Sequence, residues 1–290
     1  MFGNPIRMGG LLTSLTPSSA CYTAVLEPPT DNNVYYSQVL HKSGSRSARF
    51  SFVTPDCNQK CEDLYSLVDF LSFQAGEMGA LNVLAQIEES HPFFEILRRA
   101  GFSVYSWESI WRVPETPSSS AQEPAWTSPE PGDENAIRCL YQTLVPPLVQ
   151  HAEPYASESF PRLVYRKQGD ILAYVDILSG SAGTCLMPLV HPSVEDVSAI
   201  FPGLINMLRQ KKKPVYLQVR SYQAWLSDAL ETAAAVPSPR FALLVKHLAL
   251  EKRYPSSEGV RVRGEQRQAE PTATIVNQFQ DPGSQAEGIK

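Results

Sequence analysis

Strand-like and helix-like segments follow one another in the same order in residues 10–113 and again in residues 134–253. Matching landmarks recur at a nearly constant offset in the two blocks: Pro55 corresponds to Pro192, Leu84 to Leu217, and Arg112 to His247. Solenoid repeats have periods of only about 20–50 residues. The offset here is as long as an ordinary domain, and it therefore indicates duplication of a whole domain.

Each block alternates short β-rich runs with amphipathic helical stretches. The first block predicts strands at 21–26, 34–41 and 48–53, a helix at 58–76, a strand at 81–87, a helix at 92–100 and a strand at 102–112. The second predicts a helix at 138–150, strands at 163–167, 171–178 and 184–190, a helix at 194–210, a strand at 215–219, a helix at 222–233 and a strand at 241–248. Gly101 is predicted to end the second helix of the first block.

Two segments have a composition unsuited to a packed core. Residues 114–133 and 254–290 are rich in proline, serine, glycine, glutamine and charge, which is typical of linkers and disordered tails. The sequence therefore predicts an N-terminal domain at 1–113, a linker at 114–133, a C-terminal domain at 134–253 and a disordered tail at 254–290. With 43% hydrophobic residues, both domains can bury a core.

Composition also bears on partners and compartment. A net charge of −5 argues against nucleic acid, which needs a basic face. We expect a cytoplasmic protein without a membrane segment, since no apolar run approaches the roughly 20 residues of a span. Five scattered cysteines do not form a disulfide framework, and Cys57 and Cys61 lack the second pair of ligands that a zinc site needs. No metal site is expected.

Short motifs at matching places in both blocks resemble those of a known family. Val53-Thr54-Pro55 and Val190-His191-Pro192 resemble the V-x-P that ends the fourth strand of GNAT acyltransferases. Residues 96–102 resemble that family's last helix running into Gly-Phe. The resemblance implies an α/β fold, of the α+β mixed-sheet kind, with two tandem GNAT-like acyl-CoA N-acyltransferase domains. It also implies that the fourth and fifth strands splay, so that 52–54 with 84–86, and 189–191 with 217–219, line a cleft.

The family's pyrophosphate loop has lost its glycines in both blocks. In the family, an Arg/Gln-x-x-Gly-x-Gly/Ala loop binds acyl-CoA through amides at a helix N-terminus. Its three positions fall on Asn58, Cys61 and Asp63 in one block and on Glu195, Ser198 and Ile200 in the other. Carboxylates at a helix start repel a phosphate. We therefore expect ordinary helix starts, with Glu62 and Asp63 in the first helical turn, Asp56 as a cap, and Ser193 with Asp196 forming a capping box.

The family's proton donor is missing too. Many members carry a tyrosine four residues before the Gly-Phe glycine, and these positions are Leu97 and, with Ala234-Ala235 in place of Gly-Phe, Leu230. Tyr105 and Tyr222 are interpreted as packing residues rather than substitutes.

Two functions stay open. As an enzyme, the protein would transfer an acyl group from acetyl-CoA or another acyl-CoA to a small-molecule amine. The cofactor would lie along Val53, Thr54, Asn58, Val190 and His191, and the catalytic residue is unassigned. As a pseudoenzyme, it would be a non-catalytic GNAT-like module that binds a ligand or a protein partner, or forms a homo-oligomer. Four tryptophans would then be candidates for an interface: Trp107, Trp111, Trp126 and Trp225. For Trp107, Trp111 and Trp225, packing inside the domains is the simpler interpretation.

Overall fold

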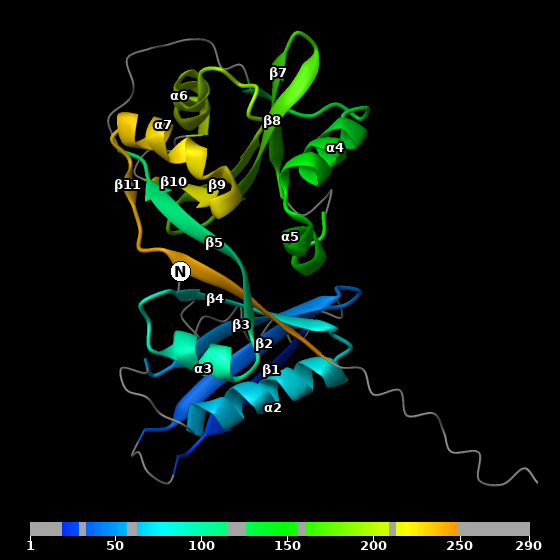
Figure 1. The fold of residues 1–290 in the computed structure, drawn as a ribbon, viewed down its shortest axis with the longest axis vertical. Coiled ribbons are helices and arrows are strands. Elements are labelled where there is room, and N and C mark those ends of the chain that lie inside the picture. The colour runs from blue at the N-terminus through cyan, green and yellow to red at the C-terminus, as the bar shows by residue number, and fades with distance from the viewer. Residues whose placement is uncertain are drawn as a thin grey trace, which may run out of the picture. The chain divides into compact units, whose positions relative to one another are not determined.

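Twelve strands form one mixed sheet in the computed structural model, which describes residues 19–28, 33–56, 63–114, 126–155, 160–208 and 213–248 (Figure 1). The strands are β1 (Ser19–Leu26), β2 (Tyr35–Lys42), β3 (Ser47–Thr54), β4 (Asn82–Glu88), β5 (Ser103–Arg112), β6 (Trp126–Thr127), β7 (Arg162–Lys167), β8 (Asp170–Ser179), β9 (Thr184–Val190), β10 (Val215–Arg220), β11 (Val236–Pro237) and β12 (Phe241–His247). The helices are α2 (Asp63–Glu77), α3 (Phe93–Arg99), α4 (Glu134–Leu144), α5 (Pro147–Ala152), α6 (Val197–Leu208), the 3-10 helix η1 (Ser221–Leu226) and α7 (Ser227–Thr232).

The strand order is β1-β2-β3-β4-β12-β5-β10-β9-β8-β7-β6, with β11 paired to β5. Within it, β3 pairs with β4 and β9 pairs with β10 in parallel, and both ladders are short. In the first ladder Ser47 is paired with Asn82 at one end and Arg49 with Leu84 at the other. In the second, Thr184 is paired with Val215 and Leu186 with Leu217. Leu84 and Leu217, which the sequence predicts to correspond, therefore end the two ladders. The predicted splay of the fourth and fifth strands is confirmed in both halves.

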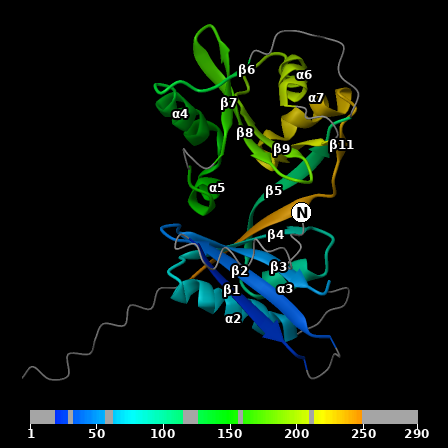
Figure 2. The same cartoon turned by 180° about the vertical axis from the view of Figure 1, so that it is seen from behind.

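The helices pack on the sheet through their apolar faces. Leu64, Leu67, Val68 and Leu71, which the sequence places on one face of a helix, are among the buried residues of α2. Figures 1 and 2 show α2 and α3 on one face of the N-terminal strands. α4 and α5 share a different core with residues from both halves, including Leu84 of β4 and Val164 of β7.

The predicted C-terminal cap of α3 is confirmed. Gly101 has a φ of +86°, in the left-handed region. Its N–H donates to the Arg98 carbonyl at 3.1 Å, and the Phe102 N–H donates to the Leu97 carbonyl at 3.1 Å. This is the Schellman motif, which satisfies two carbonyls at the end of a helix.

α7 ends in the same way with alanine in place of glycine. Ala234 has a φ of 55°, its N–H donates to the Glu231 carbonyl at 2.9 Å, and the Ala235 N–H donates to the Leu230 carbonyl at 3.0 Å. The predicted equivalence of Gly101-Phe102 with Ala234-Ala235 is therefore confirmed.

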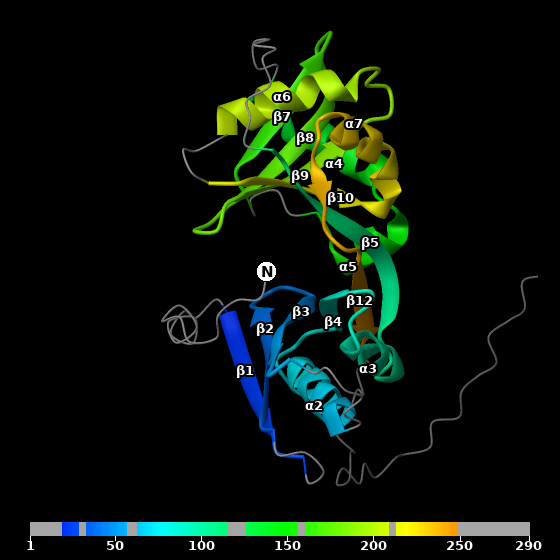
Figure 3. The ribbon, with the colours of Figure 1, turned by 90° about the vertical axis from the view of Figure 1, so that its left-hand side faces the viewer.

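The last strand of the chain lies in the N-terminal half of the sheet. The sequence predicts a strand at 241–248 that ends the second block, but β12 pairs with β4 and β5. β5 in turn runs on from β12 to pair with β10 and β11 (Figure 3). The sheet is continuous because β5 is long enough to serve both halves.

The end of the predicted linker is ordered. Trp126, which the sequence places at 114–133, forms β6 with Thr127 and pairs with β7. Its side chain is 3% exposed and its Nε1–H donates to the Ile200 carbonyl at 2.9 Å. The rest of the linker at 115–125 and the predicted tail at 254–290 lie outside the described residues. In the part of the chain that the structure describes, no helix is long and apolar enough to cross a membrane.

Candidate functional site

A glutamine side chain occupies the gap where β9 and β10 diverge after the Leu186/Leu217 pair, which we call the C-terminal splay. The Gln223 Nε2 donates to the Pro188 carbonyl at 2.9 Å, and its Oε1 accepts the Val190 N–H at 2.8 Å. Gln223 is 2% exposed and Val190 is 1% exposed. The next amide, of His191, donates to the Leu172 carbonyl at 2.8 Å. The main-chain N–H groups of Val190 and His191, two residues predicted to bind the cofactor, are therefore both hydrogen-bonded within the protein.

The start of α6 is capped by its own carboxylate. The Asp196 Oδ1 accepts the Ala199 N–H at 3.1 Å and the Ser198 hydroxyl at 2.6 Å, and these bonds lower the pKa of Asp196. The prediction that Ser193 is the cap was wrong: its hydroxyl and N–H both bond to the His191 Nδ1, at 2.7 and 3.1 Å. Asp196 directly precedes the first helical residue, Val197, so its carboxylate can reach the N–H of the third helical residue, Ala199. Ser193 lies three residues before this capping position.

The corresponding gap between β3 and β4, after the Arg49/Leu84 pair, is less enclosed; we call it the N-terminal splay. Val53 and Thr54 are half-buried and Pro55 and Asp56 are exposed. Their strand is held on the other side by β2, where the Ser37 hydroxyl donates to the Phe52 carbonyl at 2.9 Å. Asn58 and the rest of 57–62, including Cys61 and Glu62, lie outside the described residues.

Across the wide end of this splay, Asp56 contacts a histidine. The His91 Nδ1 accepts the Phe93 N–H at 3.1 Å, so the neutral ring carries its proton on Nε2, which donates to the Asp56 Oδ1 at 2.7 Å. Asp56, which the sequence predicts as a helix cap, thus lies against the start of α3. Asp63 is the first residue of α2, as its predicted place in the first turn requires.

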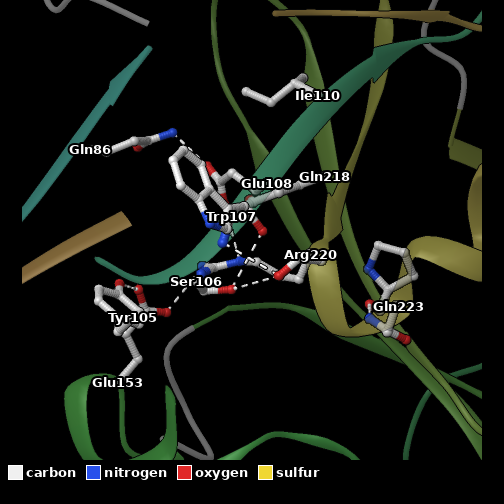
Figure 4. Close-up of polar contacts among 12 residues, drawn as sticks. Gln86, Tyr105, Ser106, Trp107, Glu108, Ile110, Glu153, Gln218, Arg220 and Gln223 are labelled. Carbon is white, nitrogen blue, oxygen red and sulfur yellow. Dashed lines mark hydrogen bonds and ion pairs between the residues drawn. The ribbon is translucent and has the colours of Figure 1, made fainter. Parts of the chain in front are cut away.

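A buried polar cluster lies on the face of the sheet covered by α5. We call it the Glu108 cluster, and its charged centre is Glu108 on β5, Arg220 at the end of β10 and Glu153 just after α5 (Figure 4). The Arg220 Nε contacts the Glu108 Oε2 at 3.0 Å and its Nη2 donates to the Glu153 Oε2 at 3.0 Å. The third guanidinium nitrogen, Nη1, is buried and has no hydrogen-bond partner among the described residues.

Side chains from both strands of the N-terminal splay, β3 and β4, contact this cluster. From β4, the Gln86 Nε2 donates to the Glu108 Oε1 at 2.5 Å. From β3, the Arg49 Nη2 lies 3.8 Å from the Glu153 Oε1. Gln218 donates to Glu108, and the Tyr105 hydroxyl donates to Glu153. The cluster is therefore linked to both β3 and β4, although its centre lies on β5 and β10, beyond β12. No motif of the sequence pointed to it.

The pKa values of Glu108 and Glu153 are shifted in opposite directions. Burial raises the pKa of Glu108, which is 2% exposed, although Arg220 and Gln218 oppose the change. Burial also acts to raise the pKa of Glu153, but Arg220 and Arg49 outweigh it and the pKa is lowered. The Glu153 side chain is 22% exposed, so solvent reaches the more acidic of the two groups. Such divided pairs are typical of sites that move protons or hold charged ligands.

Tyr105 and Tyr222 pack on the core shared with α4 and α5, as the sequence predicts, and the Tyr105 hydroxyl also takes part in the Glu108 cluster. Tyr105 bonds to Glu153, and its pKa is raised well above the ordinary value by burial and by that carboxylate. Burial raises the pKa of Tyr222 to about 12, although Arg220 opposes the rise. Leu97 and Leu230, at the family's tyrosine positions, are buried core residues.

Comparison with known proteins gives the fold a name. No protein-family model matches this sequence, and no curated protein sequence matches it significantly. Among solved structures, a GCN5-related N-acetyltransferase from Kribbella flavida matches with a TM-score of 0.50 and 10% identity, over 85% of this chain and 96% of that one. A GCN5-related N-acetyltransferase from Sphaerobacter thermophilus matches with a TM-score of 0.48 and 16% identity, over 73% and 76%. A tandem GNAT protein from the clavulanic acid biosynthesis pathway matches with a TM-score of 0.44 and 13% identity, over 82% and 86%.

The fold class follows from the strand order together with the Kribbella flavida structure. The chain is a mixed α/β protein in which two halves each carry a splayed parallel strand pair. Its fold is that of the GNAT acyltransferases, arranged as two GNAT-like domains. The fold alone does not fix an activity.

Proposed function

We propose that this protein binds an acyl-CoA at the N-terminal splay and transfers the acyl group to an amine. The observation that carries the proposal is the difference between the two splays. In the C-terminal half Val190 is 1% exposed and its amide is bonded to Gln223, whereas its counterpart Val53 is half-buried and lies beside exposed residues. The C-terminal half would then serve as a scaffold.

The chemistry follows from what surrounds this splay. Main-chain amides along Val53 and Thr54 would polarise the thioester carbonyl. The acceptor nitrogen attacks the carbonyl carbon, the carbon–sulfur bond breaks, the coenzyme leaves as a thiolate that takes up a proton, and the amine loses one. Arg220 and Arg49 lower the pKa of Glu153 and keep it ionised, and its side chain is 22% exposed, so its carboxylate would accept a hydrogen bond from the ammonium form of the acceptor.

The first test is calorimetric titration with acetyl-CoA. We expect one site per chain, and loss of that site in Thr54→Trp, which fills the N-terminal splay. The matched control is His191→Trp, at the equivalent position of the other half, which should leave binding unchanged. No heat and no thermal shift at millimolar acetyl-CoA in the folded wild-type protein would refute the proposal. Release of free thiol in the presence of a panel of amines, and its loss in Glu153→Gln, tests the transfer step.

A second function is favoured by the acidic helix start and by the pairing within the Glu108 cluster. Asp63 begins α2, where it opposes a pyrophosphate, and Glu108 joins β4, β5 and β10 through Gln86, Gln218 and Arg220. In this alternative the protein is a non-catalytic module that binds a small ligand or a protein partner, or forms a homo-oligomer. A folded protein that ignores acetyl-CoA but forms a dimer in sedimentation equilibrium would favour it.

A further inference from the structure

The N-terminal edge of the sheet is a long strand with no second partner among the described residues. β1 begins the strand order and pairs with β2 alone (Figure 3). Its eight residues include no charge and no proline, and its pairing with β2 runs without a register shift. Charges, prolines, bulges and very short strands are the means by which natural sheets prevent edge-to-edge pairing, and β6 at the opposite edge is only two residues long. The edge of β1 is therefore suited to an added strand.

Two exposed aromatic side chains lie beside this edge. The Phe70 ring of α2 packs edge-on against Tyr22 of β1, with the ring centroids 5.9 Å apart, and Phe70 is still 44% exposed. Phe73, one helical turn further on, is 61% exposed. Asp69 points the other way, since its carboxylate accepts a hydrogen bond from Lys246 on β12. The two phenylalanines thus lie on the side of α2 that faces the edge.

The two ends of β1 carry opposite charges. Ser19, at the start of β1, is paired with Lys42 of β2, whereas Glu27 follows the last residue of β1, and both charged residues are exposed. If two copies of β1 pair antiparallel about Thr23, Ser19 of one copy stands opposite Glu27 of the other. Lys42 and the second copy's Glu27 then lie in one row, about 10 Å or two strand spacings apart, on the same face of the sheet. Their long side chains can meet, and two-fold symmetry makes the contact twice.

We propose that a second copy of this chain adds its own β1 to this edge, antiparallel and centred on Thr23, and so forms a two-fold dimer with a continuous sheet. In this register Thr23 faces its own counterpart, and Val25, which is 55% exposed, faces Cys21 of the second copy. Because α2 packs over β1 and β2, the two copies of α2 would lie about 10 Å apart across the axis, an ordinary distance between packed helices. The inference is independent of the proposed acyl transfer, since β2 lies between β1 and the strands of the N-terminal splay.

Sedimentation equilibrium of the full chain, with single and paired charge reversals, tests the proposal. The wild type should form a dimer. Glu27→Lys and Lys42→Glu should each weaken dimerisation about tenfold, because each places like charges together at both ends of the interface. The double variant should restore the dissociation constant to within about threefold of the wild type. A monomeric wild type at about 100 μM, or a double variant no tighter than the single variants, would overturn the proposal.

Thr23→Asp tests the register. The Gln38 side chain donates to the Thr23 hydroxyl at 3.0 Å, and an aspartate keeps an acceptor there. In the dimer two carboxylates would oppose each other at the axis, so this variant should be monomeric. Thr127→Asp, the same change at an exposed residue of the edge strand β6, is the matched control and should stay dimeric. A dimeric Thr23→Asp, or a monomeric Thr127→Asp that is folded by circular dichroism, would refute pairing through β1. If Thr23→Asp does not fold, the exchange of charge between Glu27 and Lys42 still decides.

Discussion

Replacing Ala234 by glycine is expected to stabilise the protein, because Ala234 ends α7 with a φ of 55°. A left-handed conformation costs a residue other than glycine roughly 1–2 kcal/mol. Glycine gives back about 0.5–1 kcal/mol through the greater entropy of its unfolded chain. The net gain in unfolding free energy is about 0.5–1 kcal/mol, which urea denaturation resolves as a shift in midpoint at constant m-value.

Two neighbouring substitutions make the test specific. Gly101→Ala, at the matching position after α3, should lower the unfolding free energy by about 0.5–1 kcal/mol. The cost there is in the backbone alone, since the nearest atom to an added Cβ is the Lys246 Cε at 4.0 Å. Ala233→Gly, where φ is −78°, should also destabilise, by about 0.5–1 kcal/mol. If Ala234→Gly were no more stable than wild type, the argument that the left-handed conformation of Ala234 costs stability would be refuted.

Three further predictions concern stability. Glu153→Gln should destabilise the protein by about 1–3 kcal/mol at pH 7. Because the pKa of Glu153 is lowered in the folded protein, its contribution to stability is present above the ordinary pKa of 4.5 and is lost as the pH falls through the folded pKa. The unfolding free energy of the variant should therefore depend less on acid pH than that of the wild type, and an identical pH profile would contradict this. Gly183→Ala should cost about 1–3 kcal/mol, measured by thermal melting, because a Cβ there would lie 2.6 Å from the Pro214 carbonyl oxygen at a φ of 153°, whereas Gly132→Ala, with nothing within 4 Å, should be tolerated. Trp126→Ala should cost about 3–5 kcal/mol and Trp126→Phe about 1–3 kcal/mol in urea unfolding, and a neutral Trp126→Ala would show that this residue behaves as part of a linker after all.

The candidate site was only partly within reach of the sequence. The loss of the loop glycines drew attention to the two helix starts, and at α6 a carboxylate does hold the first amides, although it is that of Asp196 and not the hydroxyl of Ser193. The two candidates lie within one helical turn of each other, and only the observed start of α6 at Val197 decides between them. Gln223 was missed because it is one polar residue in an amphipathic stretch, and its partners lie far back in the chain, on β9.

The Glu108 cluster was missed for a related reason. Glu108, Glu153 and Arg220 lie on three segments whose separations in the chain follow no motif. The sequence does hold one signal: Glu108 interrupts a strand of aromatic and β-branched residues, where a charge needs a partner if it is buried. Its partner could not be named without the sheet order.

By itself, the sequence determined the kinds and the order of the elements. Hydrophobic periodicity identified the buried face of α2, glycine marked the end of α3, and the recurrence of one element order predicted two halves with matching strand pairs. These features depend on residues close together in the chain. Only the tertiary structure decided where β12 pairs, because buried strands with Ala242, Leu243, Leu244 and Val245 fit any central position of a sheet. For the same reason the pairing of β5 with both β12 and β10, which brings Glu108 to Arg220, depends on contacts between distant segments that no local pattern encodes.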